Sequence, residues 1–93
     1  MPSARPDWTD EARQDLAAII GYIAADNPAA ADTFLDRIFE RTATLPHHPQ
    51  AFRKGRLPGT REMVIHPNCI LVYAARDEAV TILRLLHSAR NWP

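Results

Sequence analysis

The sequence has few of the residues that cross-link a chain or anchor it in a membrane. Its single cysteine, Cys69, excludes an intrachain disulfide and fits a reducing cytoplasm. No apolar run approaches the ~20 residues that span a bilayer. The N-terminal MPSARPDW also lacks the apolar stretch of a signal peptide. We therefore expect a cytoplasmic protein that does not associate with membranes.

Motifs for metals, cofactors and nucleophilic catalysis are also missing. His47 and His48 lie between two prolines, and no second His or Cys stands at a spacing typical of metal ligands. The sequence contains no phosphate-binding loop, nucleophile elbow or EF-hand pattern. We therefore expect neither a metal nor a cofactor.

The charge is balanced overall but divided unevenly along the chain. The 93 residues carry 11 Lys and Arg against 11 Asp and Glu, and this length predicts one domain, 1–93. Residues 1–50 hold four Arg and eight acids, a net charge of −4, whereas residues 51–93 hold seven cations and three acids, a net charge of +4. This division suggests a basic face toward an acidic partner or a polyanion, although a solvated surface would give the same count.

Two amphipathic helices are predicted in the first half of the chain. Thr9 is suited to cap a helix that ends near Ala25, and Leu16, Ile19, Ile20 and Ile23 form one apolar stripe on it. Asn27 can cap a second helix, whose first position suits Pro28 and which runs to about Leu45. So short a connection predicts an antiparallel helical hairpin.

The second half predicts a small antiparallel sheet. Strands are expected at residues 61–65, 69–75 and 79–87, joined by turns at 66–68 and 76–78. Residues 46–59 are a loop with at most a short strand, and residues 4–8 can add an edge strand. The expected fold class is α+β, with an N-terminal antiparallel helical hairpin packed on one face of a three- to four-stranded antiparallel sheet.

Arg84 is an anomaly in the last strand, VTILRLLH. Strict alternation places Arg84 on one face with Val80, Ile82 and Leu86, and both faces of this strand are largely apolar. An arginine there needs an acidic partner, an open face or a phosphate.

The remaining candidates are further cations and one histidine. Arg61 opens a strand, with Arg53, Lys54 and Arg56 just before it, and Arg90 lies near the C-terminus. If the sheet brings Arg84 alongside these cations, they form a basic concavity suited to phosphate. His87 ends the last strand, where it can act as a general acid or base or simply be a structural histidine.

Several segments together resemble the RelE/ParE toxin superfamily of bacterial type II toxin–antitoxin modules. They are W-T-x-x-A-x-x-D-L at the start, the helix residues Phe34 and Ile38, then P-G-T-R-E, H-P-N…I-L-V-Y and I-L-R-L-L-H. The resemblance covers nearly the whole chain, and it rests on the order and spacing of these segments. It implies a growth-inhibiting toxin, of the kind found in plasmid stabilisation systems, that is neutralised by a cognate antitoxin in a hetero-oligomer.

The superfamily divides by mechanism. RelE-like members are ribosome-dependent mRNA endonucleases with clustered basic residues and often a C-terminal tyrosine or histidine, whereas ParE-like members inhibit DNA gyrase. Arg61 and Arg84 match basic positions of the nuclease branch, and His87 would complete the set, but the C-terminal tyrosine is absent. Cleavage by a 2′-hydroxyl needs a base and an acid besides charge stabilisation, and His87 alone can supply them here.

This incomplete set leaves enzyme activity open and favours the ParE-like, non-enzymatic interpretation. The alternatives are a RelE-like endonuclease and a non-toxic module that only stabilises a partner protein. In the binding interpretations, the partner contacts are expected at Arg53, Lys54, Arg56, Arg61, Arg84 and Arg90.

Overall fold

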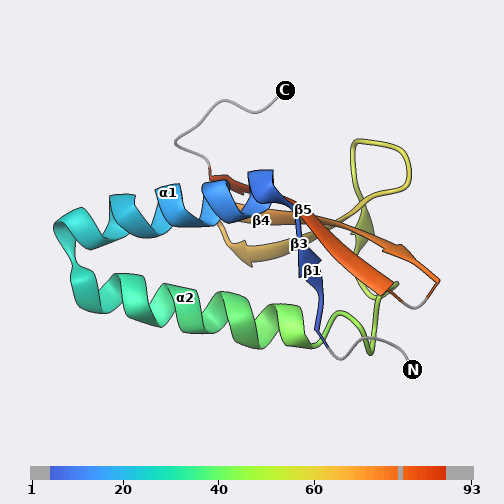
Figure 1. The fold of residues 1–93 in the computed structure, drawn as a ribbon, viewed down its shortest axis with the longest axis horizontal. Coiled ribbons are helices and arrows are strands. Elements are labelled where there is room, and N and C mark those ends of the chain that lie inside the picture. The colour runs from blue at the N-terminus through green and yellow to red at the C-terminus, as the bar shows by residue number, and fades with distance from the viewer. Residues whose placement is uncertain (1–4, 78, 88–93) are drawn as a thin grey trace.

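The computed structural model describes residues 5–77 and 79–87. Its elements in chain order are β1 (Asp7–Trp8), α1 (Asp10–Asp26), α2 (Pro28–Ala43), β2 (Arg53–Lys54), β3 (Arg61–His66), β4 (Cys69–Arg76) and β5 (Ala79–His87). Figure 1 shows the two helices as a hairpin beside the sheet, where α1 packs against β5 and α2 contacts β3. The α+β class is confirmed.

Both predicted helix caps form. The Thr9 hydroxyl accepts a hydrogen bond from the Ala12 amide at 3.1 Å, and the Asn27 side chain accepts one from the Ala30 amide at 3.0 Å. Pro28 takes the first position of α2, where a missing N–H costs nothing. The second helix ends at Ala43, before the predicted Leu45, because the chain turns there to bury the Leu45 side chain in the core.

The prediction of a three- to four-stranded antiparallel sheet was wrong in strand number and in direction. The sheet has five strands in the order β1-β5-β4-β3-β2, and β1 runs parallel to β5. The chain between these two parallel strands is long enough to return in the same direction, since it contains both helices and strands β2 to β4. The helical hairpin is not the N-terminal element, because β1 precedes it. The strand β2 was not predicted as a separate strand, because its two residues are too few to show an alternating pattern.

The strict alternation predicted for the last strand was also wrong. Val72 pairs with Arg84 and Tyr73 with Ile82, so Leu83 is an extra residue in β5, a β-bulge. The bulge reverses the faces beyond it, and Leu85 joins Val80 and Ile82 in the core. Arg84 therefore lies on the opposite face from Ile82.

The core fills the space between the helices and one face of the sheet. Its largest fully buried side chains are Tyr73, Ile38, Leu45, Met63, Leu71 and Ile82. The Tyr73 hydroxyl donates a hydrogen bond to the Pro49 carbonyl oxygen at 2.7 Å, which ties the 46–52 loop to β4. Within the part of the chain that the structure describes, neither helix combines the length and apolarity needed to cross a membrane.

Candidate functional site

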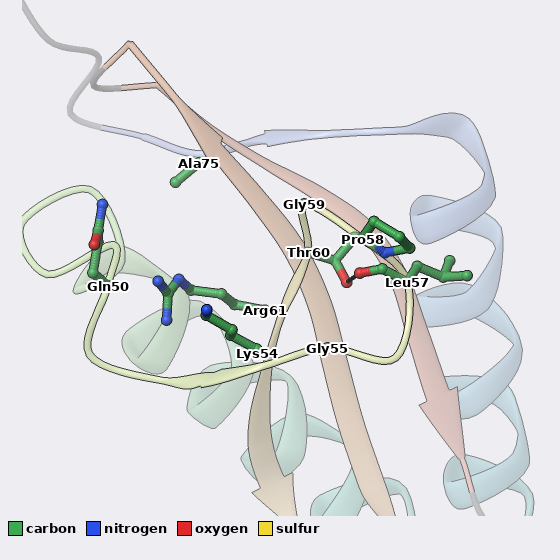
Figure 2. A pocket seen from close by; sticks show the side chains of 9 residues that line it. All are labelled: Gln50, Lys54, Gly55, Leu57, Pro58, Gly59, Thr60, Arg61 and Ala75. Atoms are coloured by element: carbon green, nitrogen blue, oxygen red, sulfur yellow. Dashed lines mark hydrogen bonds between the residues drawn. The ribbon is translucent and has the colours of Figure 1, made fainter.

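A hollow of about 320 Å³ lies at the β2 edge of the sheet. It is lined by Gln50, Lys54, Arg61, Ala75 and residues of the loop that joins β2 to β3. Figure 2 shows the Lys54 ammonium beside the Arg61 guanidinium, with Gln50 on the side toward which the Arg61 guanidinium points. We call this feature the rim hollow.

The two cations of the rim hollow are a cross-strand pair. Lys54 is the register partner of Arg61, and the next pair toward the loop is joined by a hydrogen bond from the Gly55 amide to the Thr60 carbonyl oxygen at 2.8 Å. Because the pairs of an antiparallel ladder alternate, Lys54 and Arg61 form a non-hydrogen-bonded pair, whose side chains lie closest together. The strand register thus brings two like charges to one spot.

Arg61 is held in place, whereas Lys54 is not. One guanidinium nitrogen of Arg61 donates to the Phe52 carbonyl oxygen at 2.8 Å, which leaves other N–H groups of the fork available. Burial raises the pKa of Tyr73, and the positive charge of neighbouring Arg61 lowers that pKa in part. Lys54 is exposed and has no hydrogen-bond or ion-pair partner among residues 5–77 and 79–87.

Two glycines fix the loop that closes the rim hollow. Gly59 has a φ of 79°, a conformation that side-chain-bearing residues rarely adopt. A Cβ atom on Gly55 would lie 2.3 Å from the Thr60 hydroxyl oxygen, which donates to the Leu57 carbonyl oxygen at 2.7 Å. Substitution of Gly55 would therefore push this hydroxyl out of place and reshape the wall.

Arg53 and Arg56, the other predicted cations of this segment, do not join Lys54 and Arg61. Arg53 is the register partner of Glu62, on the opposite face, and its guanidinium forms a 3.0 Å ion pair with that carboxylate. The Glu62 side chain also accepts from the backbone amide of Arg56 at 3.3 Å, and the Arg56 residue is exposed. An intramolecular acid thus partly neutralises the charge on that face.

Arg84 is likewise directed away from the rim hollow. Its guanidinium donates to both carboxylate oxygens of Asp15, at 2.6 and 3.1 Å, and the Leu85 amide donates to the same carboxylate at 3.0 Å. The hydrogen bond to Asp15 raises the pKa of Arg84. On β4, Arg84 pairs with Val72 and Arg61 pairs with Tyr73. Because consecutive residues of a strand point to opposite faces, Arg84 and Arg61 face opposite sides of the sheet. The single concavity containing both arginines does not form.

His87 lies at the other end of the sheet from the rim hollow. His87 pairs with Cys69 of β4, whereas Arg61 pairs with Tyr73, four residues further along the same strand. At the rise of a β-strand these two positions lie ~13 Å apart. Its ring lies 5.8 Å from the ring of Tyr22, measured between centroids. The predicted catalytic set of Arg61, Arg84 and His87 is therefore spread over two faces and two ends of the sheet, and Arg90 lies outside the described residues.

Sequence reasoning missed the partners of these residues. In the sequence, Asp15 stood out only as the D of the W-T-x-x-A-x-x-D-L segment and as one of the eight acids of residues 1–50, because nothing in its spacing reveals contact with a strand 69 residues later. No local pattern pointed to Gln50, which meets Lys54 and Arg61 only in the fold. The same holds for Tyr22, whose ring lies near that of His87.

Across the described ranges, 5–77 and 79–87, no three His, Cys, Asp or Glu side chains gather to hold a metal ion.

Comparison with known sequences matches this chain to toxins. The family described as "ParE toxin of type II toxin-antitoxin system, parDE" matches residues 7–92. "Putative toxin Y4kP" of Sinorhizobium fredii is 36% identical over 95 residues, covering 100% of this chain and 97% of that protein. Toxin RelE2 of Caulobacter vibrioides is 35% identical over 85 residues, covering 89% and 93% respectively.

Comparison with solved structures gives the same fold. A structure of the chromosomal ParDE TA system from P. aeruginosa matches with a TM-score of 0.76 at 23% identity, covering 91% of this chain and 98% of that one. The YoeB–YefM complex from Staphylococcus aureus matches with a TM-score of 0.62 at 17% identity, covering 89% and 94%. The match over nearly the whole sequence and the two relatives above 30% identity place the chain in the RelE/ParE superfamily, and it belongs to the ParE toxin family of type II toxin–antitoxin systems.

Proposed function

We propose that the protein is a ParE-like toxin that inhibits DNA gyrase by binding, without enzymatic activity, and that a cognate antitoxin neutralises it in a cytoplasmic hetero-oligomer. One observation carries the choice against nuclease activity: Arg61, Arg84 and His87 do not converge on one point. General acid–base catalysis requires the proton-transferring group within hydrogen-bond reach of the reacting atoms. A separation of ~13 Å along the sheet does not meet that requirement.

The ion pair of Arg84 supports the same choice. A phosphate would have to compete with the Asp15 carboxylate, which binds the guanidinium through two hydrogen bonds and is itself only 11% exposed. Such charge-assisted, bidentate pairs are among the stronger polar contacts in proteins. Arg84 thus supports the fold at the junction of α1 and β5.

An apolar surface on the helices suits an antitoxin. A hollow of about 390 Å³ between the two helices is lined by Trp8, Arg13, Leu16, Ala17, Ile20, Leu35 and Phe39. Phe39 is 48% exposed and stacks edge-on against Trp8. Exposed apolar surfaces of this kind mark protein-binding sites. The similar solved structures are a ParDE TA system from P. aeruginosa and a complex of YoeB with YefM from S. aureus, which agrees with a partner protein here.

The decisive experiment measures both candidate targets with the purified protein. We expect DNA gyrase to lose supercoiling activity in the presence of the toxin, while mRNA in a translating extract stays intact. Unimpaired supercoiling at high toxin excess would refute the proposal. Codon-linked mRNA cuts that disappear in Arg84→Ala or His87→Ala would establish the RelE-like alternative, and normal growth on induction without antitoxin would favour the non-toxic binding module.

A further inference from the structure

We propose that the rim hollow binds a carboxylate side chain from an acidic, partly apolar segment of a partner protein. The proposal deepens the proposed function, since the antitoxin is the expected source of this segment. The first observation is the electrostatic repulsion between the two cations of the rim hollow. Like charges directly opposite on paired strands destabilise a sheet, yet Lys54 and Arg61 occupy such a pair. An anion between them would turn this repulsion into two attractions.

The geometry provides donors for an oxyanion. Arg61 is anchored to the Phe52 carbonyl oxygen at 2.8 Å, so its fork is positioned before a ligand arrives. Lys54 has no partner in the described chain and can rotate toward the ligand. The Gln50 amide lines the same hollow and can donate a third hydrogen bond.

The wall of the rim hollow favours a peptide over a nucleic acid. Leu57, which is 54% exposed, and Pro58 add an apolar part to the lining, from the loop that joins β2 to β3. None of the described residues that line the hollow is aromatic, so no base can stack there as in single-strand binding sites. The nearby Arg53 is paired with Glu62 on the other face, so the cations do not form a track along a phosphate backbone.

The open edge of β2 adds a backbone contact. The strand order places β2 at the edge of the sheet. In a non-hydrogen-bonded pair the backbone groups point away from the partner strand, so the Lys54 N–H and C=O face the outside of the sheet. An extended segment laid along β2 could bond to these groups while its carboxylate enters the rim hollow.

The test titrates the ¹⁵N-labelled full chain with short capped peptides followed by NMR. The probe alternates glutamate with valine and leucine, and the matched peptide carries glutamine in place of each glutamate. We expect the glutamate peptide to shift the amide signals of Gln50, Lys54 and Arg61, and the glutamine peptide to leave them unchanged. The shifts should weaken with added salt, because the site is exposed.

Two substitutions of exposed cations show whether the peptide binds at the rim hollow. Lys54→Gln should weaken binding of the glutamate peptide by about two- to fivefold, the loss expected for one exposed ion pair. Arg37→Gln is the matched control, since Arg37 is exposed on α2, and it should leave binding unchanged. The Lys54 side chain has no hydrogen-bond or ion-pair partner among the described residues. The variant should therefore stay folded, with amide signals dispersed as in the parent protein.

Each contrary outcome overturns the proposal. Shifts caused by a short single-stranded RNA but not by the glutamate peptide would assign the rim hollow to nucleic acid. Shifts caused by inorganic phosphate alone would indicate adventitious ion binding only. If both peptides bind equally well, or if neither binds, the rim hollow does not recognise a carboxylate side chain. The titration measures binding without gyrase, so it can fail while the gyrase assay succeeds, and the reverse.

Discussion

Removal of the Asp15 carboxylate should destabilise the protein by about 2 kcal/mol. This carboxylate accepts from the backbone amide of Leu85, a residue that is 2% exposed, and from two nitrogens of Arg84. Asp15→Ala leaves a buried N–H without a partner, at a cost of about 1–3 kcal/mol. The ion pair adds at most about 1 kcal/mol, because the Arg84 side chain is 37% exposed. The higher helix propensity of alanine returns about 0.5 kcal/mol.

Urea unfolding followed by circular dichroism measures this change. For a domain of this size, 2 kcal/mol corresponds to a melting temperature lower by roughly 8–16 °C. Asp36→Ala is the matched control, since Asp36 is exposed on α2 and the substitution has the same effect on helix propensity. We expect that variant to stay within about 0.5 kcal/mol of the parent.

A second variant separates the two contributions of Asp15. Asp15→Asn keeps an oxygen that can accept from the Leu85 amide but removes the charge that pairs with Arg84. It should therefore cost about 1 kcal/mol or less. If the asparagine variant is as unstable as the alanine variant, the ion pair dominates and the argument from the buried N–H is wrong. If Asp15→Ala matches Asp36→Ala, the carboxylate contributes nothing to the junction of α1 and β5.

Three further predictions concern the sheet. Lys54→Gln should raise the free energy of unfolding by about 0.3 kcal/mol at low salt, because it removes the repulsion from Arg61, and a lower stability would contradict this. Burial raises the pKa of Cys69 from 9.0 to about 11. The unfolded thiol therefore ionises first as pH rises, and Cys69 should cost the folded state about 2 kcal/mol between pH 9 and 11, so the loss in Cys69→Ala should be smaller by about that amount. Tyr73→Phe removes the 2.7 Å bond to the Pro49 carbonyl oxygen, so unfolding should become easier by about 1 kcal/mol; unchanged urea unfolding would contradict this.

Local signals in the sequence predicted the helices well. Thr9, Asn27 and Pro28 act within four residues of their own position, so the sequence around them determines both caps. The strand pairing was harder to predict because it depends on contacts far apart in the chain. The parallel pairing of β1 with β5 joins residues 74 positions apart, Asp7 with Thr81, and no periodicity in either segment encodes that direction.

The candidate site was predicted only in part for the same reason. Lys54 and Arg61 lie seven residues apart on a short hairpin, and local reasoning placed both in one basic group. The bulge at Leu83 could not be read from an apolar strand, since every neighbouring residue suits either face. One extra residue was enough to move Arg84 from the face of Ile82 to the face of Val72, where it meets Asp15.

The charge division of the sequence therefore has two different physical meanings in the fold. Arg84 comes from the basic half and Asp15 from the acidic half, so their ion pair uses the imbalance to hold α1 on the sheet. Arg53 is neutralised by Glu62 within its own half. Lys54 on the edge strand β2 and Arg61 on β3 face each other, and the strand register places no acidic residue of the described chain opposite either of them. An internal carboxylate accounts for Arg84 and Arg53, whereas an acid supplied by another molecule would neutralise Lys54 and Arg61.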